Sequence, residues 1–146
     1  LTDGRKRSKA ILESGRALDK FRELVVSQGG DGRVIEDYGL LPMASEKRRI
    51  LSRSSGYVAG FDVERIGFLC VDLGGGRRDK SDRIDHGTGF VFHKKLGDRV
   101  RAGDPLLTVY YNSKDDRIIA GMEEELISRV IRISGRKAKV PPLIYL

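Results

Sequence analysis

The sequence predicts an α+β fold, in which helices come first and short, mostly antiparallel strands follow. Two observations support this prediction. Residues 5–28 carry a helical pattern of apolar side chains, whereas short β-type segments alternate with turn signals from residue 48 onward. One apolar helical segment at 63–73 interrupts the strands, and a second follows the residues near 111. Helices first and strands later are typical of α+β proteins.

Residues 1–31 are predicted to be a helical segment. Ser14-Gly15 separates a short basic helix, Arg5–Glu13, from a second helix that starts at Arg16. The second helix places one apolar stripe on one face, formed by Ala17, Leu18, Phe21, Leu24 and Val25. A lone amphipathic helix of this length is marginal in water, so we expect the stripe to dock on another surface, in this chain or outside it. Residues 32–47, with Gly39 and Pro42 as breakers, are predicted to be an irregular linker.

Residues 48–146 are predicted to form the α/β domain. Asp62 is a candidate N-cap for a helix over Val63–Leu73, and Gly74-Gly75-Gly76 ends that helix. Its expected buried face consists of Ile66, Leu69, Cys70 and Leu73. Strands are expected at Arg48–Arg53, Tyr57–Phe61, Gly89–His93, Val100, Pro105–Tyr111 and Arg129–Ser134, with a turn at Ser54–Gly56. The other expected elements are a helix over Ser113–Ile127 and an extended tail over Lys139–Leu146.

Composition narrows the function classes. The net charge of +7 raises nucleic acid as a partner. However, residues 1–55 carry 12 basic and 8 acidic side chains and residues 56–146 carry 16 and 13, so the excess is spread evenly. Aromatic residues make up only 7% and do not interleave with a basic cluster, which disfavours nucleic acid.

The expected location is the cytoplasm, with no membrane association. No apolar run reaches the ~18–20 residues of a membrane span, and no signal peptide is recognisable. Cys70, the single cysteine, has no partner for a disulfide within the chain. The chain begins with Leu1 inside an expected helix, so we expect it to be a piece of a longer protein.

The loop Leu73–Asp85 is the main candidate for a working surface. Its residues Gly74, Gly75, Gly76, Arg77 and Arg78 combine close backbone approach with two guanidinium groups, which suit a phosphate or an acidic partner. The glycines follow a helix instead of preceding one, so the helix dipole does not favour an anion there. We therefore interpret the segment as a loop between domains.

Other constellations favour neither a metal site nor a nucleophile. His86 and His93 lack the spacing of a zinc site, and one cysteine cannot build a structural one. Paired carboxylates are confined to surface-like runs, and no serine sits in a nucleophile elbow. Lys94 and Lys95 precede a GDRVRAGDPL segment, whereas the lysine of a lipoyl-type carrier follows such a segment, so that similarity concerns the fold alone.

Five motifs together resemble the C-terminal portion of the pyrimidine-nucleoside phosphorylase / thymidine phosphorylase family. In chain order they are SGRALDKFRELVVSQGGD (Ser14–Asp31), SGYVAGFDVERIG (Ser55–Gly67), LGGGRRDKSDRID (Leu73–Asp85), GFVFHKKLGDRVRAGDPL (Gly89–Leu106) and PPLIY (Pro141–Tyr145). The resemblance implies an α/β-hammerhead or barrel-sandwich-hybrid-like domain. It also implies a cytoplasmic, homodimeric enzyme that cleaves pyrimidine nucleosides with inorganic phosphate to base and (deoxy)ribose 1-phosphate.

The same resemblance assigns no catalytic residue to this chain, because the phosphate-binding and pyrimidine-binding segments of the family lie in earlier parts of its chains. It implies phosphate as co-substrate, no further cofactor, and the missing N-terminal domains as partners; the chain alone is predicted to be inactive. It places the loop Leu73–Asp85 where it meets the opposite domain on cleft closure, so replacing Arg77 and Arg78 by alanine should lower turnover. The alternatives are a free-standing binding module on the same fold and, less favoured, a nucleic-acid-binding domain.

Overall fold

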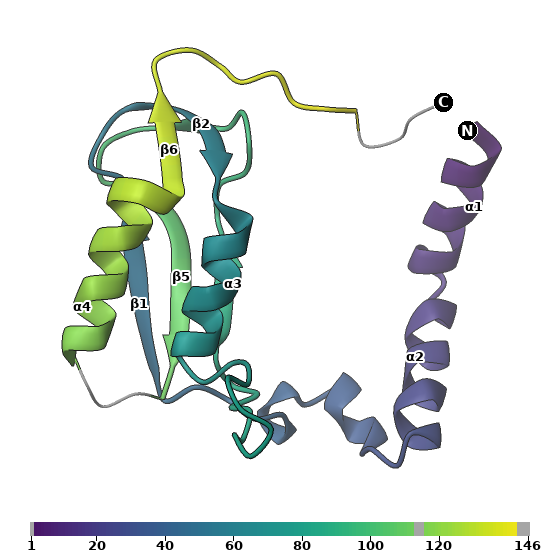
Figure 1. Ribbon diagram of the computed structural model, residues 1–146. Helices are drawn as coiled ribbons and strands as arrows, with labels where there is room; N and C mark the ends of the chain where they lie inside the picture. The colour runs from purple at the N-terminus through teal and green to yellow at the C-terminus, as the bar shows by residue number, and fades with distance from the viewer. Residues whose placement is uncertain (1, 113–115, 143–146) are drawn as a thin grey trace. The chain divides into compact units, whose positions relative to one another are not determined.

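The computed structural model describes residues 2–112 and 116–142, and the chain divides into two compact units, Leu1–Pro42 and Met43–Leu146 (Figure 1). The division falls inside the segment predicted as a linker. Within the described residues, no helix is long and apolar enough to cross a membrane.

The first unit is helical, as predicted. It contains α1 (Thr2–Glu13) and α2 (Arg16–Ser27), separated at Gly15, and neither helix has a buried residue. Two short 3₁₀ helices follow, η1 (Gly32–Ile35) and η2 (Tyr38–Leu40), where an irregular segment was predicted. They form because the carboxylates of Asp31 and Asp37 accept the backbone N–H of the residue two positions later, each at 2.9 Å.

The second unit contains two antiparallel three-stranded sheets, which confirms the α+β class. The first sheet has the order β1 (Glu46–Leu51), β5 (Pro105–Tyr111), β3 (Gly89–Phe92). The second has the order β4 (Arg99–Val100), β2 (Gly56–Phe61), β6 (Ile131–Ser134). The turn predicted between β1 and β2 does not pair these strands; it carries the chain from one sheet to the other.

Two helices accompany the sheets, α3 (Val63–Asp72) and α4 (Asp116–Glu125). The predicted cap is confirmed, because the Asp62 carboxylate accepts the Arg65 N–H at 2.9 Å. A π-helical turn, η3 (Leu126–Val130), continues α4 up to β6, where the sequence predicted helix and then strand. Residues 113–115, the predicted start of that helix, lie outside the described residues, as do residues 143–146 of the predicted tail.

The core of the second unit is formed by strands of both sheets together with α3, α4 and η3. Its most deeply buried side chains are Ile50, Val58, Val100, Leu107, Val109, Ile119, Leu126 and Val130. Leu69 of α3 and Leu73, the residue that caps this helix, are buried as predicted, whereas Ile66 and Cys70 are half-buried. The end of α3 therefore rests on this core, and the candidate loop begins there (Figure 1).

Candidate functional site: the loop that follows α3

Gly74 and Gly75 end α3 in a Schellman motif. The Gly74 N–H donates to the Val71 carbonyl and the Gly75 N–H to the Cys70 carbonyl, both at 2.9 Å. Gly74 has a φ of +92°, a left-handed conformation that a side chain would strain. A Cβ on Gly75 would lie 2.6 Å from the Cys70 Sγ, so the backbone there touches the helix. In this structure the first glycines of the loop terminate and pack against α3.

The two arginines of the loop have different surroundings. Arg78 forms an ion pair with Asp72, the last residue of α3. Asp72 also lies 4.0 Å from Arg65, whose Nη2 donates to Glu125 Oε2 at 2.9 Å, so Arg78 belongs to a chain of charges that reaches the end of α4. Arg77 is exposed and forms no hydrogen bond or ion pair with any described residue. Of the two, Arg77 is the one whose guanidinium is available to a partner.

Asp82 organises the middle of the loop. One of its carboxylate oxygens, Oδ2, accepts the backbone N–H groups of Asp79 and Arg78, each at 3.0 Å. These two hydrogen bonds, from Asp79 first, favour the ionised form and lower the pKa of Asp82 from its usual value. The turn that carries Arg77 and Arg78 is thus held from within the loop.

Asp85 fixes the end of the loop to the first sheet. Its Oδ2 accepts Asn112 Nδ2 at 2.7 Å and Thr88 Oγ1 at 3.0 Å, and its Oδ1 accepts the Gly87 N–H at 3.0 Å. The hydrogen bond from Asn112, ahead of the other contacts, lowers the pKa of Asp85. Asn112 follows β5 and accepts the Ser45 N–H at 2.7 Å, just before β1. The loop is therefore anchored at both ends.

Sequence reasoning placed Asp85 at the loop boundary but missed this anchoring role. The sequence Asp85-His86-Gly87 is a signal for an Asx turn, in which a carboxylate accepts the N–H two residues later. This local signal could have been read from the sequence, so a signal for the role of Asp85 was available. The contact with Asn112 was not, because it joins residues 27 positions apart in the chain.

His93, Lys94 and Cys70, which the sequence also singled out, each have surroundings of their own. The Nε2 of His93 lies 2.7 Å from Thr108 Oγ1, and Lys94 pairs with Asp104 at 3.2 Å. Cys70 is half-buried, and desolvation raises the pKa of its thiol, which disfavours the nucleophilic thiolate. In residues 2–112 and 116–142, no three His, Cys, Asp or Glu side chains gather as a metal site would require. What the loop offers chemically is an exposed cation on an anchored backbone, suited to contact with an anionic group.

Comparison with known proteins links this chain to one enzyme family. Residues 57–127 match the family model of the pyrimidine nucleoside phosphorylase C-terminal domain. The chain is 34% identical over 146 residues to a pyrimidine-nucleoside phosphorylase of Bacillus subtilis (strain 168), covering 99% of this chain and 32% of that protein. The enzyme of the same name from Geobacillus stearothermophilus is 32% identical over 145 residues, covering 99% of this chain and 33% of that protein. The chain thus spans about a third of the length of these curated relatives.

Proposed function

The chain is related, through residues 57–127 and beyond, to the C-terminal portion of pyrimidine-nucleoside phosphorylases, and we propose that it is part of such an enzyme. The match of residues 57–127 to the family model confirms the family resemblance predicted from the motifs. In the proposed reaction the bond between the pyrimidine nitrogen and the sugar C1 breaks, and a phosphate oxygen bonds to C1. The products are the free base and a (deoxy)ribose 1-phosphate. The observation that carries the proposal is the 34% identity along 99% of this chain.

We further propose that the catalytic groups belong to the remaining two-thirds of such an enzyme. This chain has an exposed arginine on an anchored loop, and the Thr108 hydroxyl that contacts His93 is only 4% exposed, which disfavours contact with a substrate. The proposed enzyme is cytoplasmic and homodimeric, with phosphate as co-substrate and no further cofactor. Its second unit has the α/β-hammerhead or barrel-sandwich-hybrid-like architecture, a proposal that two small antiparallel sheets support.

The proposed role of the loop Leu73–Asp85 is to help order the closed, water-excluded state of the cleft. Phosphorolysis requires such a state because water competes with phosphate for the sugar carbon. Arg77 is the residue proposed to contact the opposite domain, since its guanidinium forms no hydrogen bond or ion pair with a described residue and interacts with Asp82 only electrostatically. Arg78 and the three glycines position it through Asp72 and the end of α3.

The test is a phosphorolysis assay with uridine or thymidine, run on this chain alone and on the longer protein that contains it. We expect activity from the longer protein only. A longer protein that cleaves neither nucleoside in the presence of phosphate would contradict the proposal, and so would activity of this chain alone. An immunoblot of source cells would reveal the free-standing binding module instead, if the band lay at 16.3 kDa.

The same assay tests the loop with one substitution. Arg77→Ala in the longer protein should lower kcat by roughly tenfold or more and raise the fraction of nucleoside lost to hydrolysis, because closure is impaired. Arg49→Ala is the matched control, since Arg49 is an exposed arginine of β1 outside the loop. Equal kcat values for the two variants would rule out the proposed role of Arg77.

A further inference from the structure

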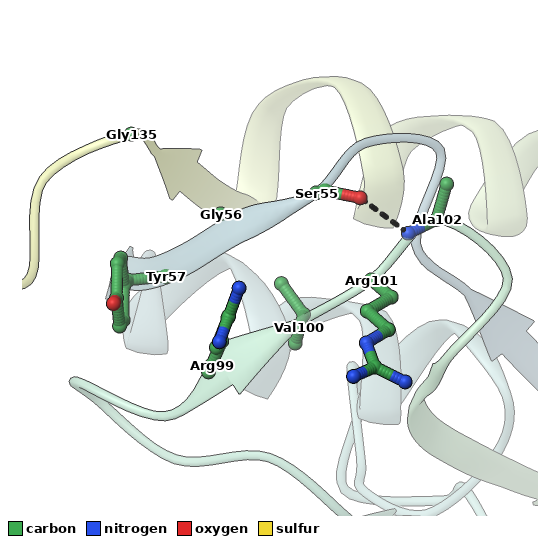
Figure 2. Close-up of a pocket in the computed structure, with 8 residues that line it drawn as sticks. All are labelled: Ser55, Gly56, Tyr57, Arg99, Val100, Arg101, Ala102 and Gly135. Carbon is green, nitrogen blue, oxygen red and sulfur yellow. Dashed lines mark hydrogen bonds between the residues drawn. The ribbon is translucent and has the colours of Figure 1, made fainter.

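A pocket lies at the end of the second sheet, on elements other than the loop that follows α3. It occupies about 570 Å³ between β2, the short strand β4 and the turn after it, with Gly135 closing one side (Figure 2). Ser55 Oγ accepts the Ala102 N–H at 3.0 Å and holds the turn against the start of β2. A volume of a few hundred cubic ångströms is the size expected for a small-molecule site.

Two arginines and a tyrosine are the functional side chains of this pocket. Tyr57 and Arg99 are direct partners across the β2–β4 pair, and Arg101 follows two residues along the chain (Figure 2). Between the arginines, Val100 is 1% exposed and contributes to the core. Because side chains alternate along a strand, a buried Val100 directs Arg99 away from the core, and Arg101 follows directly after the end of β4. Both arginines are exposed, whereas Tyr57 is half-buried.

The positive charge of the pocket is only partly offset by carboxylates, since Asp104 interacts electrostatically with Arg101. The residues that line it include no Asp or Glu, and neither guanidinium forms a hydrogen bond or ion pair with a described residue. The nearest carboxylates in sequence have other partners. Asp98 Oδ2 accepts the Lys95 N–H at 2.8 Å, and Asp104 Oδ2 accepts Lys94 Nζ at 3.2 Å and the Arg101 backbone N–H at 3.1 Å.

Three arginines elsewhere in the same unit, in contrast, are paired with carboxylates. Arg48, Arg53 and Arg65 each form an ion pair with one glutamate of α4, respectively Glu123, Glu124 and Glu125. Two like charges that line one concave surface, with no carboxylate among the lining residues, attract anions from solution. We infer that the pocket between β2 and β4 binds the phosphate group of a small phosphomonoester, with Arg99 and Arg101 as its ligands.

The size and the aromatic side chain narrow the ligand class further. A guanidinium matches the geometry of a phosphate oxygen pair, so two of them can hold a dianion by charge-assisted hydrogen bonds. The pocket exceeds the needs of a phosphate ion alone, and Tyr57 offers an aromatic face next to Arg99. A nucleoside monophosphate fits these features, with its phosphate on the arginines and its planar base against Tyr57.

The experiment is a titration of this 146-residue chain with uridine 5′-monophosphate, followed by amide chemical shifts in ¹H–¹⁵N spectra. Uridine and inorganic phosphate serve as the two half-ligands. We expect shifts at Tyr57, Val100 and Ala102, and weaker binding of inorganic phosphate at the same residues. The double variant Arg99→Ala/Arg101→Ala should weaken the affinity at least tenfold, and Tyr57→Ala should weaken binding of the monophosphate but not of inorganic phosphate.

The control distinguishes specific binding in the pocket from nonspecific electrostatic attraction of the anion to a basic protein. Arg49→Ala/Arg83→Ala removes the same charge from two exposed arginines outside the pocket and should leave the affinity within twofold. Equal loss in both double variants, or shifts elsewhere in the chain, would overturn the inference. Wild-type-like dispersion of the remaining amide signals would show that the pocket variant is folded. If that variant did not fold, Arg99→Lys/Arg101→Lys, which keeps the charge but loses the paired geometry, should still weaken binding measurably, and unchanged affinity there would overturn the inference.

Discussion

The two units of the chain place their apolar side chains in opposite environments. In the second unit, Ile50, Leu107 and Leu126 are each 0% exposed, because strands and helices share one core. In the first unit, Phe21 and Leu24 of α2 are 51% and 53% exposed, although their spacing along the helix is regular. Periodicity thus indicates which face of a helix is apolar, but burial requires a partner surface. Most of the free energy of folding should therefore reside in the second unit.

The largest expected effect comes from removing a core side chain of the second unit. Leu107 pairs with both Ile50 and Phe92 across the first sheet, and Leu107→Ala should lower the free energy of unfolding by about 2–5 kcal/mol. Leu12→Ala in α1 is the matched control; that side chain is 72% exposed, so the change should stay within about 0.5 kcal/mol. Urea denaturation followed by circular dichroism measures both. Similar losses of unfolding free energy in the two variants would contradict the proposed difference between the units.

A smaller effect on the free energy of unfolding is expected from a substitution at the loop, because the loop is held by polar contacts and not by apolar packing. The folded-state pKa of Asp85 is lowered chiefly by the hydrogen bond from Asn112, whereas an unfolded aspartate titrates near ~3.9. The stabilisation by ionised Asp85 is therefore complete above about pH 4 and is lost as the pH falls through the lower folded-state pKa. Asn112→Ala should raise the pKa of Asp85 and make the loss of stability below pH 4 less steep.

Carboxyl ¹³C titration by NMR measures this change directly. Asp82 provides an internal control, because its pKa is lowered by the backbone N–H groups of Asp79 and Arg78 instead of by Asn112. We expect the Asp82 titration to be the same in wild type and variant. An unchanged Asp85 titration in Asn112→Ala would show that the contact does not anchor the loop in solution.

Local signals in the sequence predicted individual elements well. Asp62 before an apolar helix, and glycines after it, predicted the start and end of α3, since capping depends on neighbours in the chain. Pro105–Tyr111 was predicted with its observed bounds, because a run of β-branched and aromatic residues ends at polar Asn112. These features depend only on residues close together in the chain, so they can be predicted from the sequence.

Features that depend on distant residues were not predictable in this way. β1 pairs with β5 rather than with its sequence neighbour β2, a choice made by packing of the whole core. The π-helical turn at Leu126–Val130 lies between α4 and β6, so that Leu126 and Val130 are both buried. The candidate site shows the same division. The Asx turn at Asp85 is local, whereas the Asp85–Asn112 contact and the exposure of Arg77 depend on the folded chain.

The smallest expected effect on stability comes from the apolar stripe of α2. Phe21→Ser/Leu24→Ser removes two half-exposed side chains, so the unfolding free energy of the second unit should change by less than about 0.5 kcal/mol. Binding of a hydrophobic dye to the native chain should fall, because the stripe is the most regular apolar surface of the first unit. The pair Lys20→Ser/Glu23→Ser, on the same helix, controls for effects on the helix itself. A loss above about 1 kcal/mol in the apolar variant alone would mean that the stripe contributes to the core, and the contrast between the units would then be one of degree.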